Sequence, residues 1–163
     1  MTITIRSFAE DDTEAVIALW LEVFPEYQDT SRPQRNPRLS IANKLGTQPE
    51  LFFVATRTHD DEHGSRGTIV GTAMTGYDGH RGWLYSLAVD PRMQRQGIGT
   101  RLMRHAENAL AARGCPKLNL QVLLDKPEVL AFYESLGYRA DAVVSLGKRL
   151  ESPASQTAHI SHN

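Results

Sequence analysis

The feature that most constrains this chain is a glycine-containing turn, Arg92–Gly99, between an apolar strand and a long amphipathic helix. Backbone N–H groups in the first turn of a helix have no acceptor inside the helix, and the helix dipole adds partial positive charge there. Glycine lacks the side chain that would keep a phosphate away from those N–H groups. Arg92, Arg95 and Arg101 add formal positive charge. The turn therefore predicts a binding site for a pyrophosphate.

Two other nucleotide-binding motifs do not fit this turn. A dinucleotide-binding turn needs a third small residue where Leu102 stands, and an acidic residue near Asn119 or Gln121. A P-loop needs Gly-Lys-Ser/Thr, which is absent from the sequence. These departures argue against a nicotinamide-dependent oxidoreductase. A tight turn with no ligand is the simplest alternative, because a Gly-x-Gly pair alone is weak evidence.

Apolar periodicity elsewhere predicts one mixed α/β domain (α+β in some schemes) over residues 1–150. Asp78-Gly79 lies between two apolar runs and predicts a β-hairpin. A hairpin-rich first half followed by two helical crossovers fits neither a doubly wound sheet nor a bundle. Strands are expected over Thr2–Ser7, Leu51–Thr56, Thr68–Tyr77, Arg81–Val89, Lys117–Leu123 and Tyr138–Leu150, the last as one bent strand or two short ones.

Four helices are expected between these strands. The first buries a face of Val16, Leu19, Trp20, Val23 and Phe24, and a short second helix covers Leu39–Leu45. The third buries Ile98, Leu102, Ala106, Ala109 and Leu110, and the fourth begins at Pro127 and ends at Gly137. Residues 151–163 have almost no apolar content, which predicts a disordered tail.

Composition and charge exclude several classes of partner. The chain has 163 residues, a formal net charge of −1 and an apolar fraction of 40%, enough for one core. This charge argues against broad binding to nucleic acid or to a membrane surface. A single cysteine, Cys115, excludes an internal disulfide. Since the sequence also lacks a signal peptide and a membrane-spanning apolar stretch, we expect a cytoplasmic location. We also expect no metal, because His59 and His63 flank three acidic residues in a polar segment that is typical of a solvated loop.

Two further observations on the sequence point to one enzyme family. Gln94-x-x-Gly97-x-Gly99 matches a Q/R-x-x-G-x-G/A signature, and Ala131–Tyr138 contains an F-Y-x-x-L-G-F/Y signature downstream. In this order the two segments resemble the GNAT superfamily of acetyl-CoA-dependent N-acetyltransferases. The resemblance spans Thr2 to Leu150. It implies the GNAT acyl-CoA N-acyltransferase fold, with a central, mostly antiparallel sheet splayed between strands 4 and 5 and flanked by about four helices.

Three shorter segments resemble the bacterial YpeA-type subgroup, whose acceptor the resemblance leaves undefined: Gly76–Gly82, Ala112–Lys117 and Ser145–Leu150.

The resemblance also implies roles for individual residues around acetyl-CoA. Gln94 is expected to contact the cofactor, and the pyrophosphate is expected on the backbone amides of Arg95, Gln96, Gly97, Ile98, Gly99 and Thr100. The strand that carries Leu87, Ala88 and Val89 is expected to diverge from Leu118–Val122 and leave backbone groups for the pantetheine amides. Open strand edges generally find such a partner.

Tyr133 matches the family's tyrosine that protonates, or hydrogen-bonds to, the departing thiolate. Periodicity alone would make it a core aromatic residue on the face of Val129, Phe132 and Leu136. The family's asparagine before this helix falls on Lys126, which leaves one cofactor contact open.

The usual general base has no counterpart in this sequence. Histone-type members carry a glutamate early on the strand that here reads Arg81–Leu87, which has no carboxylate. Ribosomal-protein alanine acetyltransferases carry it twelve residues before the tyrosine, where this chain has Gln121. Bulk water is one alternative, and the remaining candidates are Glu22, Glu26, Asp78, His80 and Tyr85.

Two functions therefore follow from the sequence. The first is acetyl transfer to a primary amine by direct attack in a ternary complex, and the second is a non-catalytic acyl-CoA-binding or sensing module. At pH 7, deprotonation costs about 4.6 kcal/mol for a lysine amine but about 1.1 kcal/mol for an α-amine. The expected acceptor is therefore a small molecule or a peptide N-terminus with such an α-amine. The resemblance also allows a homodimer.

Overall fold

The computed structural model describes residues 1–29, 31, 35–59 and 66–150. The chain forms two compact units, Met1–Asp125 and Lys126–Asn163. The tail predicted to be disordered, residues 151–163, lies outside the described residues. Within those residues, no helix combines the length and the apolar character that a membrane crossing requires.

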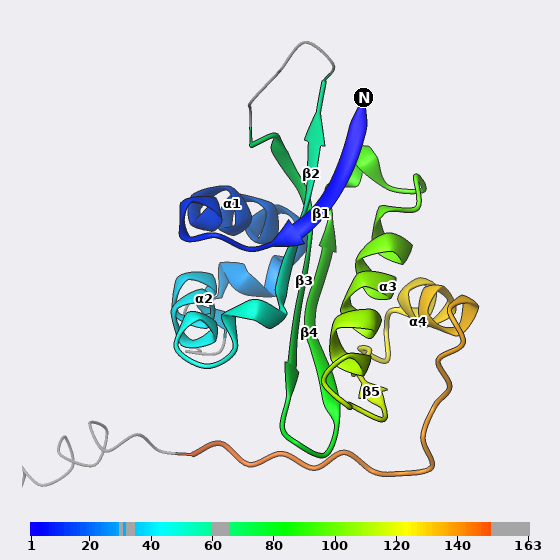
Figure 1. The fold of residues 1–163 in the computed structure, drawn as a ribbon. Helices are drawn as coiled ribbons and strands as arrows, with labels where there is room; N and C mark the ends of the chain where they lie inside the picture. The colour runs from blue at the N-terminus through cyan, green and yellow to red at the C-terminus, as the bar shows by residue number, and fades with distance from the viewer. Residues whose placement is uncertain (30, 32–34, 60–65, 151–163) are drawn as a thin grey trace, which may run out of the picture. The chain divides into compact units, whose positions relative to one another are not determined.

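The first unit is built on a five-stranded sheet in the order β1-β2-β3-β4-β5 (Figure 1). The first four strands pair antiparallel and the fifth runs parallel to β4, which confirms the mostly antiparallel sheet. The strands are β1 (Thr2–Ser7), β2 (Phe52–Thr58), β3 (Thr68–Tyr77), β4 (Gly82–Val89) and β5 (Leu118–Asn119).

The predicted hairpin joins β3 to β4. The Asp78 carboxylate accepts hydrogen bonds from the backbone N–H groups of His80 (2.7 Å) and Arg81 (2.6 Å). Gly79 has a φ of +87°, in the left-handed region that glycine adopts without strain. The turn conformation thus accounts for both Asp78 and Gly79.

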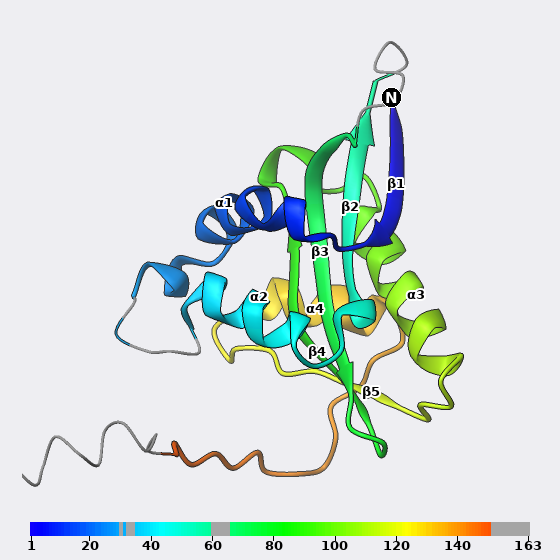
Figure 2. The same cartoon turned by 60° about the vertical axis from the view of Figure 1, so that its left-hand side comes forward.

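Helices cover both faces of this sheet. Figures 1 and 2 show α1 (Thr13–Val23) and α2 (Pro37–Leu45) on one face and α3 (Ile98–Ala111) on the other. The α2 helix begins at Pro37, before the predicted Leu39, because the Asn36 side chain caps the Leu39 N–H at 3.1 Å. Short 3₁₀ helices include η1 (Glu10–Asp12), η2 (Pro25–Gln28) and η5 (Pro91–Met93).

The core on the α1 side contains the predicted face of the first helix. Val16, Leu19 and Trp20 are buried, and the indole N–H of Trp20 donates to Thr72 Oγ1 at 2.8 Å. On the other side, α3 buries Ile98, Leu102, Ala106 and Leu110 as predicted and also buries Met103, while Ala109 is only half-buried. A Cβ at Gly71 would lie 3.0 Å from the Leu102 side chain, so this glycine lets α3 approach β3 closely.

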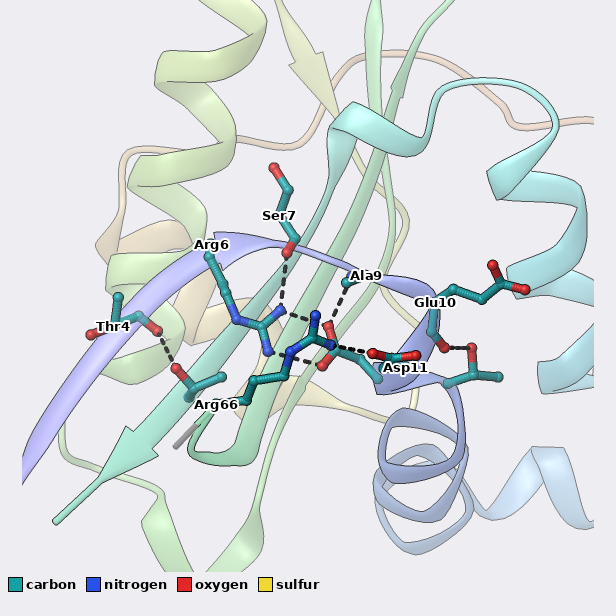
Figure 3. Close-up of polar contacts among 10 residues, drawn as sticks. Thr4, Arg6, Ser7, Ala9, Glu10, Asp11 and Arg66 are labelled. Carbon is teal, nitrogen blue, oxygen red and sulfur yellow. Dashed lines mark hydrogen bonds and ion pairs between the residues drawn. The ribbon is translucent and has the colours of Figure 1, made fainter. Parts of the chain in front are cut away.

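An ion-pair cluster fixes the start of α1 next to β1 (Figure 3). The Arg6 guanidinium donates to both carboxylate oxygens of Asp12, at 2.6 and 2.9 Å, and Arg66 donates to Asp11 at 2.9 Å. Burial alone would raise the pKa of the Asp12 carboxyl. The hydrogen bonds from Arg6 and from the Ala9 N–H outweigh burial and hold that pKa below its ordinary value.

The described part of the second unit contains α4 (Pro127–Ser135), with Pro127 in the first turn as predicted. The prediction of strands over Tyr138–Leu150 is wrong, because residues 136–150 form no strand. Val144 (84% exposed) and Leu146 (90% exposed) are instead open to solvent. A strand requires a paired neighbour, and the described residues of this unit hold only a helix.

Candidate functional site

The predicted phosphate-binding turn is an exposed loop between β4 and α3. Its first part is held by Asp90, whose carboxylate accepts a hydrogen bond from the Arg92 N–H at 2.9 Å. Met93 is buried beneath the loop. The residues that follow, 94–97, are all exposed, so the backbone of the loop is accessible to a ligand.

Two residues of the loop have left-handed backbone conformations. Gly97 has a φ of +76° and is the N-cap of α3, while Arg95 has a φ of +61°. A Cβ at Gly97 would meet nothing within 4 Å, so glycine is favoured there by backbone conformation rather than by crowding. The left-handed conformation of Arg95 costs roughly 1–3 kcal/mol in backbone strain, and such strain is typical of residues in ligand-binding loops.

The amides at the start of α3 are not used by the helix. The first hydrogen bond of α3 runs from the Arg101 N–H to the Gly97 carbonyl, at 3.0 Å. The N–H groups of Ile98, Gly99 and Thr100 precede that bond, as expected for the first turn of a helix. N–H groups in this position are the hydrogen-bond donors that anions generally bind at a helix N-terminus.

The three arginines near the loop differ in what they contact. Arg92 is paired with Asp90 (2.8 Å) and lies 3.5 Å from Glu22, and Arg101 donates to the Ile3 carbonyl at 2.8 Å. Arg95 is exposed and has no hydrogen-bond or ion-pair partner among the described residues. Arg95 is thus the arginine whose charge is available to a ligand.

Strand β4 has an open edge beside this loop. Pairing with β5 is limited to Gly82 with Leu118 and Trp83 with Asn119. The strand predicted over Lys117–Leu123 was therefore too long, because the chain leaves the sheet after Asn119. This divergence confirms the predicted splay between strands 4 and 5.

The register shows which groups of β4 reach that open edge. The Asp90 N–H donates to the Val70 carbonyl at 2.9 Å, and directly opposite residues of antiparallel strands alternate between bonded and non-bonded pairs. Ala88 lies opposite Thr72 and is two residues before Asp90, so it belongs to the same hydrogen-bonded set. The backbone N–H and C=O groups of Ala88 therefore point to β3. Leu87 and Val89 point their backbone N–H and C=O groups to the open edge.

A β-bulge interrupts β4 at the far end of this edge. Met74 pairs with Ser86 and Thr75 with Leu84, so Tyr85 is an extra residue. Because a bulge changes the side-chain alternation, Tyr85 and Ser86 both face the side of α1 and α2.

The contacts of these two residues support that orientation. The Tyr85 ring lies 5.8 Å from the Lys44 ammonium of α2, and the Ser86 hydroxyl lies 3.4 Å from the Tyr27 hydroxyl of η2. Sequence reasoning missed the bulge and singled out neither Ser86 nor Lys44, because an isolated serine or lysine carries no periodic signal.

Tyr133, the predicted acid, lies on α4 in the second unit. Its side chain is buried, with ring centroids 5.2 Å from Phe132 and 5.8 Å from Tyr138. Burial raises the pKa of Tyr133 to about 12. The phenol therefore keeps its proton at neutral pH, as a proton donor must.

The structure places the candidate bases in different surroundings. Hydrogen bonds from the Arg81 and His80 amides lower the pKa of Asp78, and this residue and His80 lie in the hairpin turn, at the other end of β4 from Val89. Burial, with Asp78 adding to it, raises the pKa of Tyr85.

The remaining predicted groups lie on other elements. Glu22 lies beside Arg92, Glu26 lies in η2, and Gln121 is exposed beyond the end of β5. Among the residues with described positions, no three His, Cys, Asp or Glu side chains are grouped so that they could hold a metal ion.

Comparisons with known proteins identify the family. The sequence profile described as "Acetyltransferase (GNAT) family" matches residues 13–138. An acetyltransferase of Yersinia pestis (strain Pestoides F) is 44% identical over 146 residues, which cover 90% of this chain and 94% of the relative.

Solved structures share the fold. The PaiA N-acetyltransferase from Thermoplasma acidophilum, in complex with coenzyme A, has a TM-score of 0.71 at 18% identity, covering 88% of this chain and 94% of that one. The ribosomal-protein-S18-alanine N-acetyltransferase from Escherichia coli has a TM-score of 0.61 at 26% identity, covering 83% and 77%. The chain therefore belongs to the acetyltransferase (GNAT) family and is an acetyl-CoA-dependent N-acetyltransferase.

Proposed function

We propose that this enzyme transfers the acetyl group of acetyl-CoA to a primary amine by direct attack within a ternary complex. The observation that carries the proposal is the row of unused N–H groups at the start of α3, next to the open edge of β4. Both features offer hydrogen bonds along one continuous path. A structural relative was solved in complex with coenzyme A.

In this proposal the loop holds the pyrophosphate and β4 holds the pantetheine arm. The amides of Arg95–Thr100, after Gln94, receive the pyrophosphate, and the exposed Arg95 guanidinium adds charge. The open-edge groups of Leu87 and Val89 bind the pantetheine amides. Ala88, whose backbone is paired with β3, separates these two residues and keeps them on the same edge.

The proposed chemistry needs one proton donor and one proton acceptor. The lone pair of the neutral amine attacks the thioester carbonyl carbon, the C–S bond breaks, and the thiolate takes a proton from Tyr133, which regains a proton from water. The raised pKa of Tyr133, about 12, keeps the donor protonated over the working range. The amine's own surplus proton passes to water, since neither usual glutamate is present.

The proposed acceptor is an α-amine of a peptide N-terminus or of an amino-acid-like small molecule. Such an amine needs only about 1 kcal/mol to lose its proton at pH 7, which water can accept without an enzyme base. One structural relative is named for N-acetylation of an alanine in a ribosomal protein. A cytoplasmic location, a homodimer and the YpeA-type subgroup stay predictions.

The second candidate is an acyl-CoA-binding or sensing module without turnover, favoured by the absence of a glutamate at Gln121 and in Arg81–Leu87. Two measurements separate the candidates: calorimetric binding of acetyl-CoA, and thiol release with a panel of small amines and free-N-terminus peptides. Turnover with an α-amine supports the enzyme. Tight binding without thiol release from any amine would favour the module.

A further inference from the structure

The open edge of β4 has two distinct ends. At its carboxyl end lies the loop to which we assign the pyrophosphate, and at its other end lies the bulge at Tyr85. A cofactor bound as proposed runs from the loop back along the edge, so its thioester lies at the bulge. The inference that follows rests on this proposed function.

A pair of hydroxyl groups lies beside the bulge. Ser86 is 6% exposed, and its Oγ lies 3.4 Å from Tyr27 Oη. Within the described residues neither hydroxyl has another hydrogen-bond partner. Each hydroxyl can donate one hydrogen bond and accept two, so a single shared contact leaves acceptor positions on both oxygens. Buried polar groups normally use their hydrogen-bonding capacity, so the acceptor positions left on these two oxygens favour a further hydrogen-bond donor there.

Tyr27 is held in place by other aromatic side chains. Its ring stacks on Trp20, with centroids 5.8 Å apart, and meets Phe24 edge-on at 5.4 Å. Trp20 is itself fully buried. The Tyr27 hydroxyl is therefore positioned by the core before any ligand arrives, which lowers the entropy lost on binding.

We propose that Tyr27 and Ser86 form the acceptor subsite and bind the attacking amine beside the thioester. Their oxygens would accept N–H hydrogen bonds from the amine, which leaves its lone pair directed at the carbonyl carbon. The acceptor then approaches from the α1 and α2 side of β4, while the cofactor occupies the strand edge. Neither hydroxyl takes the amine proton, so the subsite positions the nucleophile without acting as a base.

The test uses a bisubstrate probe in which the sulfur of CoA is joined through an acetyl group to the N-terminal nitrogen of tri-alanine. Its amide N–H stands where the attacking amine would be. Calorimetry compares the Kd of this probe with the Kd of CoA. The wild-type protein should bind the probe more tightly than CoA. Tyr27→Phe and Ser86→Ala should each weaken probe binding roughly 3- to 10-fold, the loss of one hydrogen bond, with CoA affinity unchanged.

Tyr77→Phe is the matched control, because the Tyr77 hydroxyl donates to Gly79 in the hairpin turn and should affect neither ligand. Unchanged CoA affinity also shows that the Tyr27 and Ser86 variants are folded. The subsite is overturned if both variants keep wild-type probe affinity, or if the wild type binds the probe no more tightly than CoA. Failure of the wild type to bind CoA would instead overturn the proposed function.

Discussion

Lys44 in α2 donates a hydrogen bond to the carbonyl oxygen of Thr75 in β3, just where β2 no longer covers that strand. Gln48 likewise satisfies backbone groups of β3. Its side chain accepts a hydrogen bond from the Tyr77 N–H at 2.9 Å and donates one to the Tyr77 carbonyl at 2.8 Å. Unpaired backbone groups at a strand edge are costly when buried. The two side chains therefore replace the missing strand and hold β3 beneath the bulge of β4.

This arrangement predicts a pH dependence of stability. Burial lowers the pKa of Lys44 to about 8, below the unfolded value near 10.5. Between these values the unfolded chain binds more protons than the folded one, so the contribution of Lys44 to stability rises with pH and is constant below pH 8. Urea unfolding at pH 7.5 and 9.5 should show a gain for the wild type that Lys44→Met lacks. The exposed-lysine variant Lys148→Met should keep the gain, and an equal gain in Lys44→Met would contradict the prediction.

Gly97 and Gly114 offer a matched pair for testing the phosphate loop. Both have positive φ values, +76° and +79°, and a Cβ at either would meet nothing within 4 Å. Alanine at each position should therefore destabilise the fold similarly, by about 1 kcal/mol. Only Gly97→Ala should weaken acetyl-CoA binding, and Gly97→Glu should abolish it by adding a negative charge. Calorimetry checks both, and unchanged affinity in Gly97→Glu would show that the pyrophosphate binds elsewhere.

Tyr133→Phe tests the proposed acid while keeping the ring that packs near Phe132 and Tyr138. Loss of a positioned proton donor should lower kcat by roughly 10²- to 10⁴-fold, with little change in the KM for acetyl-CoA. Tyr138→Phe is the control and should retain most activity. Because the pKa of Tyr133 is raised to about 12, the wild type should show no loss of activity from Tyr133 ionisation up to about pH 11. An unchanged kcat in Tyr133→Phe would leave this residue a role in packing only.

The acceptor should be distinguished by its own pKa. In matched peptides, a free N-terminus should be acetylated faster than an internal lysine, because less free energy is needed to deprotonate it. The rate should rise with pH up to the pKa of the acceptor. A kcat/KM profile measured with the lysine peptide that shows a separate base near pH 6 to 7 would contradict this and return attention to Glu22, Glu26 and His80.

Much of the fold could be predicted from the sequence because its signals are local. The apolar run over Thr68–Tyr77, the Asp78-Gly79 turn and the apolar face of α3 each depend on neighbouring residues, and the structure confirms the strand, the hairpin turn and most of the helix face. The glycine-containing turn before α3 likewise indicated free helix amides without any knowledge of tertiary contacts.

Tertiary structure alone decided where β4 parts from β5, which arginine stays available and which side chains meet at the bulge. Arg92 and Arg101 contact residues far away in the sequence, and Tyr27 reaches Ser86 from another element. Strand pairing and burial depend on what a distant segment supplies. The predicted strands over Tyr138–Leu150 were wrong for the same reason, since an alternating sequence forms a strand only where a partner strand is present.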